Sequence, residues 1–164
     1  MDRAETAADS PYRVPTREVE AEIEIRGARR EEVIFYLATA AETHEGGETM
    51  AEALDRKRRF LPLRSRLTGE LFLVQRKAVV TVTVSHDERP HLFQSVEGLM
   101  NSIDFVRLEL SGGEILEGAL ATLLPPESPR LSDYFNLDDV AFAPLLVGES
   151  VVYVNKNFIT VVRL

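Results

Sequence analysis

The sequence VVYVNKNFITVVRL, residues 151–164, places two apolar runs on either side of the polar step Asn155-Lys156-Asn157. A segment of the same length and design, LFLVQRKAVVTVTV, occupies residues 71–84 and has Gln75-Arg76-Lys77 at its centre. Short apolar runs rich in β-branched residues are typical of β-strands. Each segment therefore predicts two strands joined by a short turn, and the recurrence indicates a chain made of two similar halves.

Further matches precede these two segments, in the same order in each half. They are RFLPL (59–63) with AFAPL (141–145), MAEALD (50–55) with LSDYFN (131–136), and IEIRG (23–27) with LELSG (108–112). Ordered recurrence of this kind favours internal duplication over chance. Duplication predicts that the last strand of each half points into a core through Val82, Val84, Val162 and Leu164. A fully packed Leu164 would make its truncation to alanine cost about 2–5 kcal/mol.

The distribution of apolar residues predicts a mainly β protein with two tandem small β-barrels and a short helix in the first half or the connection. Thr49 is placed to cap a helix with Met50, Ala53 and Leu54 on one face. Gly118, inside the expected strand 115–123, predicts a bend or bulge. The expected organisation is a flexible N-terminal tail (1–18), a first, divergent barrel (19–84), a partly helical connection (85–104) and a second barrel (105–164).

The composition limits the classes of function. Of the 164 residues, 45% are apolar and 28% charged, as in ordinary globular domains. No apolar run approaches the length of a membrane span, and residues 1–16 lack the apolar core of a signal peptide. Cysteine is absent, which excludes disulfides and thiol chemistry and, with the previous point, predicts a cytoplasmic protein. The net charge of −8 makes nucleic acid an unfavourable partner.

The spacing V-x-L-x-L-x-x-G-x-x-L-x-G-x-L across Val106–Leu120 resembles the first motif of Sm-like proteins. The ending VYVNKNFITVV also looks like the paired last strands of that barrel, joined by a tight turn. This resemblance implies a barrel of the Sm-like or SH3-like kind and RNA contacts at the turn residues Asn155, Lys156 and Asn157. Neither that turn nor Arg76-Lys77 contains the Arg-Gly step usual in the family. RLSDYFN followed by FAPLL and VYVNK is similar to an uncharacterised bacterial family of small β-domains, which implies a fold and no activity.

The sequence does not predict a catalytic, metal or cofactor site. Zinc needs three or four converging ligands, and calcium loops need regularly spaced oxygens and a glycine. Ser111 and Ser132 have no histidine placed by the sequence to activate them. The remaining potential ligands fit solvated loops and turns: His44, His86, His91, Asp133, Asp138 and Asp139.

One cationic run stands out in this acidic chain, Arg56-Lys57-Arg58-Arg59 followed by Arg64 and Arg66. The preferred interpretation is that these cations balance the glutamates of the expected strand Glu18–Glu24. The alternative is an anion- or partner-binding site made by the five arginines. Cyclic-dinucleotide-binding barrels of the PilZ type have a loosely similar arginine arm, but the segment 109–114 lacks the glycine that their second motif requires.

These observations predict a non-enzymatic protein–protein interaction or scaffolding module without a cofactor. Exposed edge strands would bind a protein partner and would also allow oligomers. The alternative function is a ligand-sensing domain that binds an anionic small molecule through Arg56–Arg66. Sm-like RNA binding ranks third.

Overall fold

A computed structural model of the protein describes residues 14–27, 30–41, 45–85, 101–123 and 130–164. The first half contains β1 (Thr16–Ile25), β2 (Arg30–Ala38), helix α1 (Met50–Asp55), β3 (Phe60–Ser65), β4 (Leu71–Gln75) and β5 (Val79–Ser85). The second half contains β6 (Asn101–Leu110), β7 (Ile115–Leu123), helix α2 (Leu131–Phe135), β8 (Phe142–Val147), β9 (Ser150–Asn155) and β10 (Ile159–Arg163). The expected mainly β class is confirmed.

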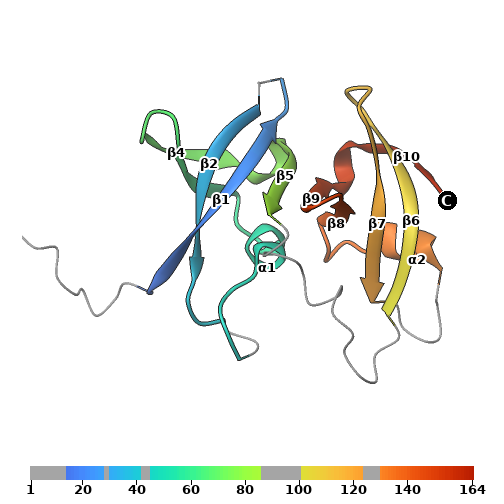
Figure 1. Ribbon diagram of the computed structural model, residues 1–164, viewed down its shortest axis with the longest axis horizontal. Coiled ribbons are helices and arrows are strands. Elements are labelled where there is room, and N and C mark those ends of the chain that lie inside the picture. Colours follow the sequence, from blue (N-terminus) through green and yellow to red (C-terminus); the bar gives the residue numbers. More distant parts are fainter. Residues whose placement is uncertain (1–13, 28–29, 42–44, 86–100, 124–129) are drawn as a thin grey trace, which may run out of the picture.

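All ten strands belong to one antiparallel sheet with the order β10-β6-β7-β8-β9-β5-β1-β2-β3-β4. Figure 1 shows the two groups of strands meeting where β5 lies beside β9. The sheet does not close on itself, because β10 and β4 are its two ends. The expectation of two barrels therefore stays a prediction.

The five strands of each half have the same order within the sheet, with the fifth strand beside the first. Their register is also the same, since Ile25 faces Val79 in one half and Leu110 faces Ile159 in the other. At the next pair in each half, the register between the first and fifth strands shifts by one residue. One residue of the fifth strand is therefore left without a partner in the first strand. An extra residue of this kind is a β-bulge. The residues passed over are Val80 in β5 and Thr160 in β10.

The fourth and fifth strands of each half do not pair with one another, in contrast to the paired last strands that the Sm-like resemblance implies. A 3₁₀ turn, Arg76–Ala78 in one half and Lys156–Phe158 in the other, carries the chain between them. Each turn is fixed by equivalent backbone hydrogen bonds, such as Arg76 N–H to Arg59 O at 3.0 Å and Lys156 N–H to Ala141 O at 2.9 Å. After the turn, the fifth strand pairs with the first strand of its half and not with the fourth.

Helix α1 begins at the residue that the sequence predicts. The Thr49 hydroxyl accepts a hydrogen bond from the Glu52 N–H at 3.2 Å, and the Glu52 carboxylate accepts one from the Thr49 N–H at 2.8 Å. This reciprocal pair is a capping box, which satisfies two N–H groups that lack partners within the helix. Met50 and Leu54 are buried, so the predicted cap and its apolar face are confirmed.

The two halves share their hydrophobic cores. The core of the first half includes three residues of the second half, Phe142, Val151 and Tyr153. The core of the second half includes Val80 of β5, the residue at the bulge. Neither core is therefore complete without the other half.

Burial of the two fifth strands differs. Val82 and Val84 are buried as expected, whereas Val162 is only partly buried and Leu164 is 88% exposed. The expectation for Leu164 is wrong because β5 has β9 along its second edge, while β10 lies at the end of the sheet. The large cost expected for truncating Leu164 assumed a packed side chain and therefore no longer applies.

Several expected features fall near or beyond the limits of the described residues. Strand β1 begins at Thr16, inside the expected tail, and β6 begins at Asn101, inside the expected connection. The expected helix of the connection and all three histidines lie outside the described residues.

Gly118 lies within β7 and lets the backbone of β8 approach closely. A side-chain Cβ at this position would overlap the carbonyl oxygen of Leu146 and lie 3.1 Å from Cγ of Leu145. The pairing of β6 with β7 passes through Gly118 without a register shift, so this pairing has no bulge there; the alternative, a bend, stays a prediction. Close approach of another backbone is the second reason for glycine in a strand.

We predict that Gly118→Ala lowers the free energy of unfolding by about 1–3 kcal/mol, because the added methyl group forces β7 and β8 apart. Gly112→Ala is the matched control, since a Cβ there meets no atom within 4 Å. Urea denaturation of both variants measures the difference. Equal stability of the two would show that β8 moves away without cost.

Candidate functional site

Arg56 of the basic run is an internal partner of a buried carboxylate. Its Nε lies 2.9 Å from Oε1 of Glu48. Glu48 is buried, and its Oε2 accepts a hydrogen bond from the Ala38 N–H at 2.8 Å. Arg56 therefore connects the end of α1 to β2, away from the glutamates of β1.

Arg64 and Arg66 lie along the glutamates of β1, as the preferred interpretation of the basic run expects. Arg64 donates to Glu18 Oε1 at 2.8 Å. Arg66 Nη1 lies 3.4 Å from Glu20 and 3.3 Å from Glu32. These arginines and Arg56 each face a different carboxylate, so three of the five candidate arginines do not converge on a common point.

The other cations of the run form a recess with the turn between β4 and β5. This basic recess has a volume of about 340 Å³ and is lined by Lys57, Arg58, Arg59, Gln75, Arg76 and Lys77. Within the described parts of the chain, only Arg76 among these cations has a side-chain hydrogen bond, and none forms an ion pair. Several cationic side chains around one recess can bind an anion through charge-assisted hydrogen bonds. The sequence did not indicate that Arg76 and Lys77 join the basic run.

The cation at the first position of each 3₁₀ turn binds the end of the helix in its own half. Arg76 Nη1 donates to the Leu54 carbonyl of α1 at 3.1 Å. Lys156 Nζ donates to the Tyr134 carbonyl of α2 at 2.6 Å and lies 4.2 Å from the centre of the Tyr134 ring. A cation is favourable there because the last carbonyls of a helix lack internal partners. Burial lowers the pKa of Lys156 to about 8, although Asp55 and Asp138 oppose this change.

Of the three turn residues for which the resemblance implies RNA contacts, Lys156 and Asn155 have internal partners. Asn155 is buried, donates to the Val79 carbonyl at 2.8 Å and accepts from the Asn157 N–H at 3.0 Å. Asn157 is exposed. Asn155 of the turn therefore stabilises the packing of the two halves, and Asn157 is the member of the three that is exposed.

The joint between the halves, defined as the pairing of β5 with β9, runs from Thr81↔Val154 to Ser85↔Ser150. Polar contacts lie at both of its sides. Asp55 Oδ1 accepts hydrogen bonds from the N–H groups of Ala141 at 3.0 Å and Phe142 at 3.4 Å. Burial raises the pKa of Asp55 despite these two bonds.

Arg30 connects the halves on the other side of the joint. Its guanidinium donates a hydrogen bond to Glu114. The guanidinium also lies 3.4 Å from Glu24 Oε2 and forms an ion pair with it, but Glu24 Oε2 accepts no hydrogen bond from the described residues. Burial, and secondly repulsion from Glu114, raise the pKa of Glu24. Arg30 and Glu114 are 84 residues apart, and no local pattern in the sequence predicts this contact.

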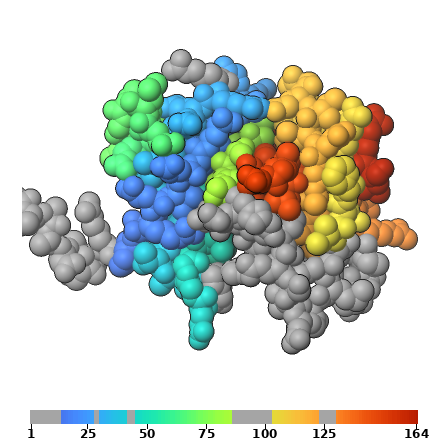
Figure 2. Space-filling view, viewed as in Figure 1, coloured from blue at the N-terminus to red at the C-terminus, as the bar shows by residue number. Residues whose placement is uncertain are grey.

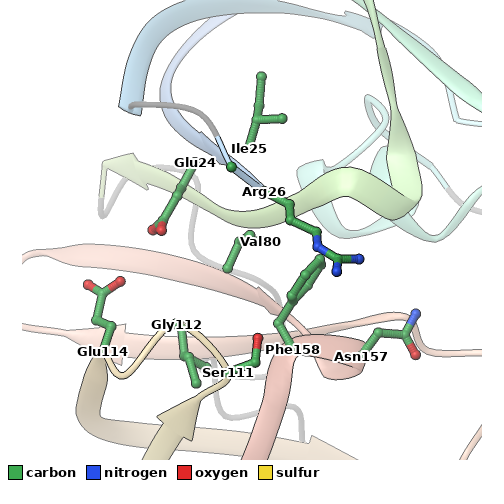
Figure 3. Close-up of a pocket in the computed structure, with 11 residues that line it drawn as sticks. Glu24, Ile25, Arg26, Val80, Ser111, Gly112, Glu114, Asn157 and Phe158 are labelled. Carbon is green, nitrogen blue, oxygen red and sulfur yellow. The ribbon is translucent and has the colours of Figure 1, made fainter.

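A larger recess of about 510 Å³ lies at the joint. Figure 3 shows Glu24 and Glu114 on one side of it, and Arg26, Asn157 and the Phe158 ring on the other. Both glutamates contact Arg30, which offsets part of their negative charge. This recess therefore results from the way the halves meet, and it offers a ligand less free charge than the basic recess.

Among the described residues, the end strands β4 and β10 each have one edge without a strand partner. Space-filling Figure 2 places β4 (green) and β10 (dark red) on opposite sides of the molecule. Leu71 and Leu73 of β4 are 69% and 67% exposed, whereas their equivalents in β9, Val151 and Tyr153, are fully buried. An unpaired edge strand with apolar side chains is a template for pairing with another chain.

Comparison with known proteins adds no relative: no protein-family model, no curated protein and no solved structure matches the chain. No helix within the described residues is long and apolar enough to cross a membrane.

We predict that Arg56→Ala lowers the free energy of unfolding by about 1–3 kcal/mol, because it leaves the buried Glu48 carboxylate without its cation. Arg58→Ala is the matched control from the same run and should change stability by less than about 0.5 kcal/mol. Thermal or urea denaturation measures both. A similar small effect for the two variants would place Arg56 among the exposed cations instead.

Proposed function

We propose that the protein is a non-enzymatic interaction module that binds other protein chains by strand addition at β4 and β10. The observation that carries this proposal is that both ends of the sheet are unpaired among the described residues, with Leu71, Leu73 and Leu164 exposed. In strand addition, backbone hydrogen bonds supply affinity and alternate side chains supply specificity. A cytoplasmic location without a cofactor is part of the same proposal.

We further propose that the chain arose by duplication of one small β-domain of the Sm-like or SH3-like kind. Shared strand order, register and bulge position support this origin. So does the cation of each 3₁₀ turn, Arg76 or Lys156, which donates to the helix of its own half. Each half is then a divergent copy of one interaction unit.

The test of strand addition compares two double variants in pull-downs from the native cell, followed by quantitative mass spectrometry. Leu71→Asp with Leu73→Asp places two charges on the free edge strand. Ile103→Asp with Phe105→Asp is the matched control, because these residues are similarly exposed, pair with β7 and lie on β6, which is not an end strand of the sheet. We expect the edge variant to lose specific partners about tenfold or more, equivalent to at least 1.4 kcal/mol, and the control to keep them.

Retention of the same partners by the edge variant would contradict strand addition. Equal loss in both variants would do so as well, because the effect would then follow from surface charge alone. Circular dichroism of both variants checks that each is folded.

The second candidate function is anion sensing at the basic recess. The observation that favours it is the gathering of Lys57, Arg58, Arg59, Arg76 and Lys77 around one hollow without an acidic residue. This recess differs from the five-arginine site that was the alternative interpretation of the basic run, since Arg56, Arg64 and Arg66 pair with glutamates. RNA binding ranks third, because Asn155 and Lys156 have internal partners.

Anion sensing predicts a saturable rise in Tm when cyclic dinucleotides or nucleotides are added. The rise should disappear in Arg59→Ala with Lys77→Ala, which removes two cations of the recess. It should persist in Arg64→Ala with Arg66→Ala, whose side chains pair with glutamates of β1 and β2. No shift for any ligand would remove this candidate from consideration.

A further inference from the structure

The joint shows how two units of this fold attach to one another. It pairs the fifth strand of the first half with the fourth strand of the second half. The contact is therefore head-to-tail, because the two halves contribute different strands. A contact of this type leaves one strand of each kind unpaired at the ends of the pair.

The strands left unpaired are a fourth strand, β4, and a fifth strand, β10. We propose that β10 of one copy of the chain pairs antiparallel with β4 of a second copy, which repeats the joint between molecules. The proposal rests on strand addition as the function of the two edges, and it names the partner as a second copy. Repetition of a head-to-tail contact produces a ring where the rotation closes, and a filament where it does not.

The register of the intermolecular pair follows from the joint. In the joint, Val82 faces Tyr153 and Val84 faces Val151. The equivalent residues at the free edges are Val162 of β10 and Leu164, which directly follows β10, together with Leu73 and Leu71 of β4. The expected pairs between two copies are therefore Val162 with Leu73 and Leu164 with Leu71.

The side chains at these positions complement one another. Val82, Val84, Val151 and Tyr153 are all buried in the core of the first half. At the free edges, Leu71, Leu73 and Leu164 are 69%, 67% and 88% exposed, and Val162 is partly buried against the core of the second half. Antiparallel pairing in this register would cover all four apolar side chains, as the joint covers their equivalents. This correspondence favours a second copy over an unrelated protein, because the chain already contains the matching surface.

The first experiment uses Leu73→Cys with Val162→Cys in the full chain, which otherwise contains no cysteine. Directly opposed residues of an antiparallel pair lie within disulfide reach. Mild oxidation should produce covalent species of three or more chains, or a closed ring, on denaturing gels without reductant. The control, Leu73→Cys with Val161→Cys, moves the second cysteine to the other face of β10 and should cross-link far less.

The second experiment measures the mass of the unmodified protein in solution by native mass spectrometry and sedimentation. We expect concentration-dependent species larger than a monomer, which Leu71→Asp with Leu73→Asp reduces to monomer and Ile103→Asp with Phe105→Asp leaves intact. A monomer at all concentrations would overturn self-assembly. So would a dimer cross-linked as efficiently by Leu73→Cys alone, because that contact joins two identical edges.

Failure of self-assembly can be separated from failure of the proposed function. If the protein is monomeric and other proteins still bind in a manner sensitive to Leu71→Asp with Leu73→Asp, strand addition holds and the partner is not a second copy. If the edge variant affects neither assembly nor partner binding, both proposals are wrong.

Discussion

The pairing of β5 with β9 joins two halves whose cores are each incomplete alone. It joins two groups of five strands into one sheet, and it brings Tyr153 and Val151 into the core of the first half. Two sets of polar contacts depend on the joint. Asp55 accepts a hydrogen bond from the chain at the start of β8, and Arg30 forms ion pairs with Glu24 and Glu114. Burial raises the pKa values of Asp55 and Glu24, so these groups are costly to keep charged at the joint. The apolar side chains that the joint buries, such as Val151 and Tyr153, must offset that cost.

The two halves show how one backbone can be used in two environments. The residue at the bulge is Val80 in β5, where it reaches the core of the second half, and Thr160 in β10, where its hydroxyl donates to the Glu109 carbonyl. Val33 in β2 is buried among apolar residues, while its equivalent in β7 is Gly118, which makes room for the backbone of β8. Differences between the halves therefore follow from the neighbour that each position meets, although the strand order and the position of the bulge are the same.

Local patterns were sufficient to predict the strands, the helix α1 and its cap. Alternating apolar residues and a Thr-x-x-Glu sequence act within a few residues, so the sequence displays them directly. The exposure of Leu164 could not be predicted, because it depends on which strand lies beside β10. For the basic run, some ion-pair partners could be predicted from the sequence and others could not. Arg64 and Arg66 lie along the glutamates of β1 as expected, but Arg56 pairs with Glu48, whose burial results from tertiary packing. The basic recess combines the run with Arg76 and Lys77, and their proximity follows from the placement of the 3₁₀ turn beside α1.

The joint also has a consequence for the order in which the chain folds during synthesis. Neighbouring strands such as β1 with β2 and β3 with β4 are close in sequence, so their loops close at low entropic cost. The joint connects β5 with β9 across the part of the chain that contains β6, β7 and β8, and contacts of such long range form late. Since the first half leaves the ribosome before β9 exists, β5 and the place later filled by Tyr153 are temporarily uncovered. The interval before β9 is made is therefore the period in which a nascent chain can pair β5 with the wrong strand.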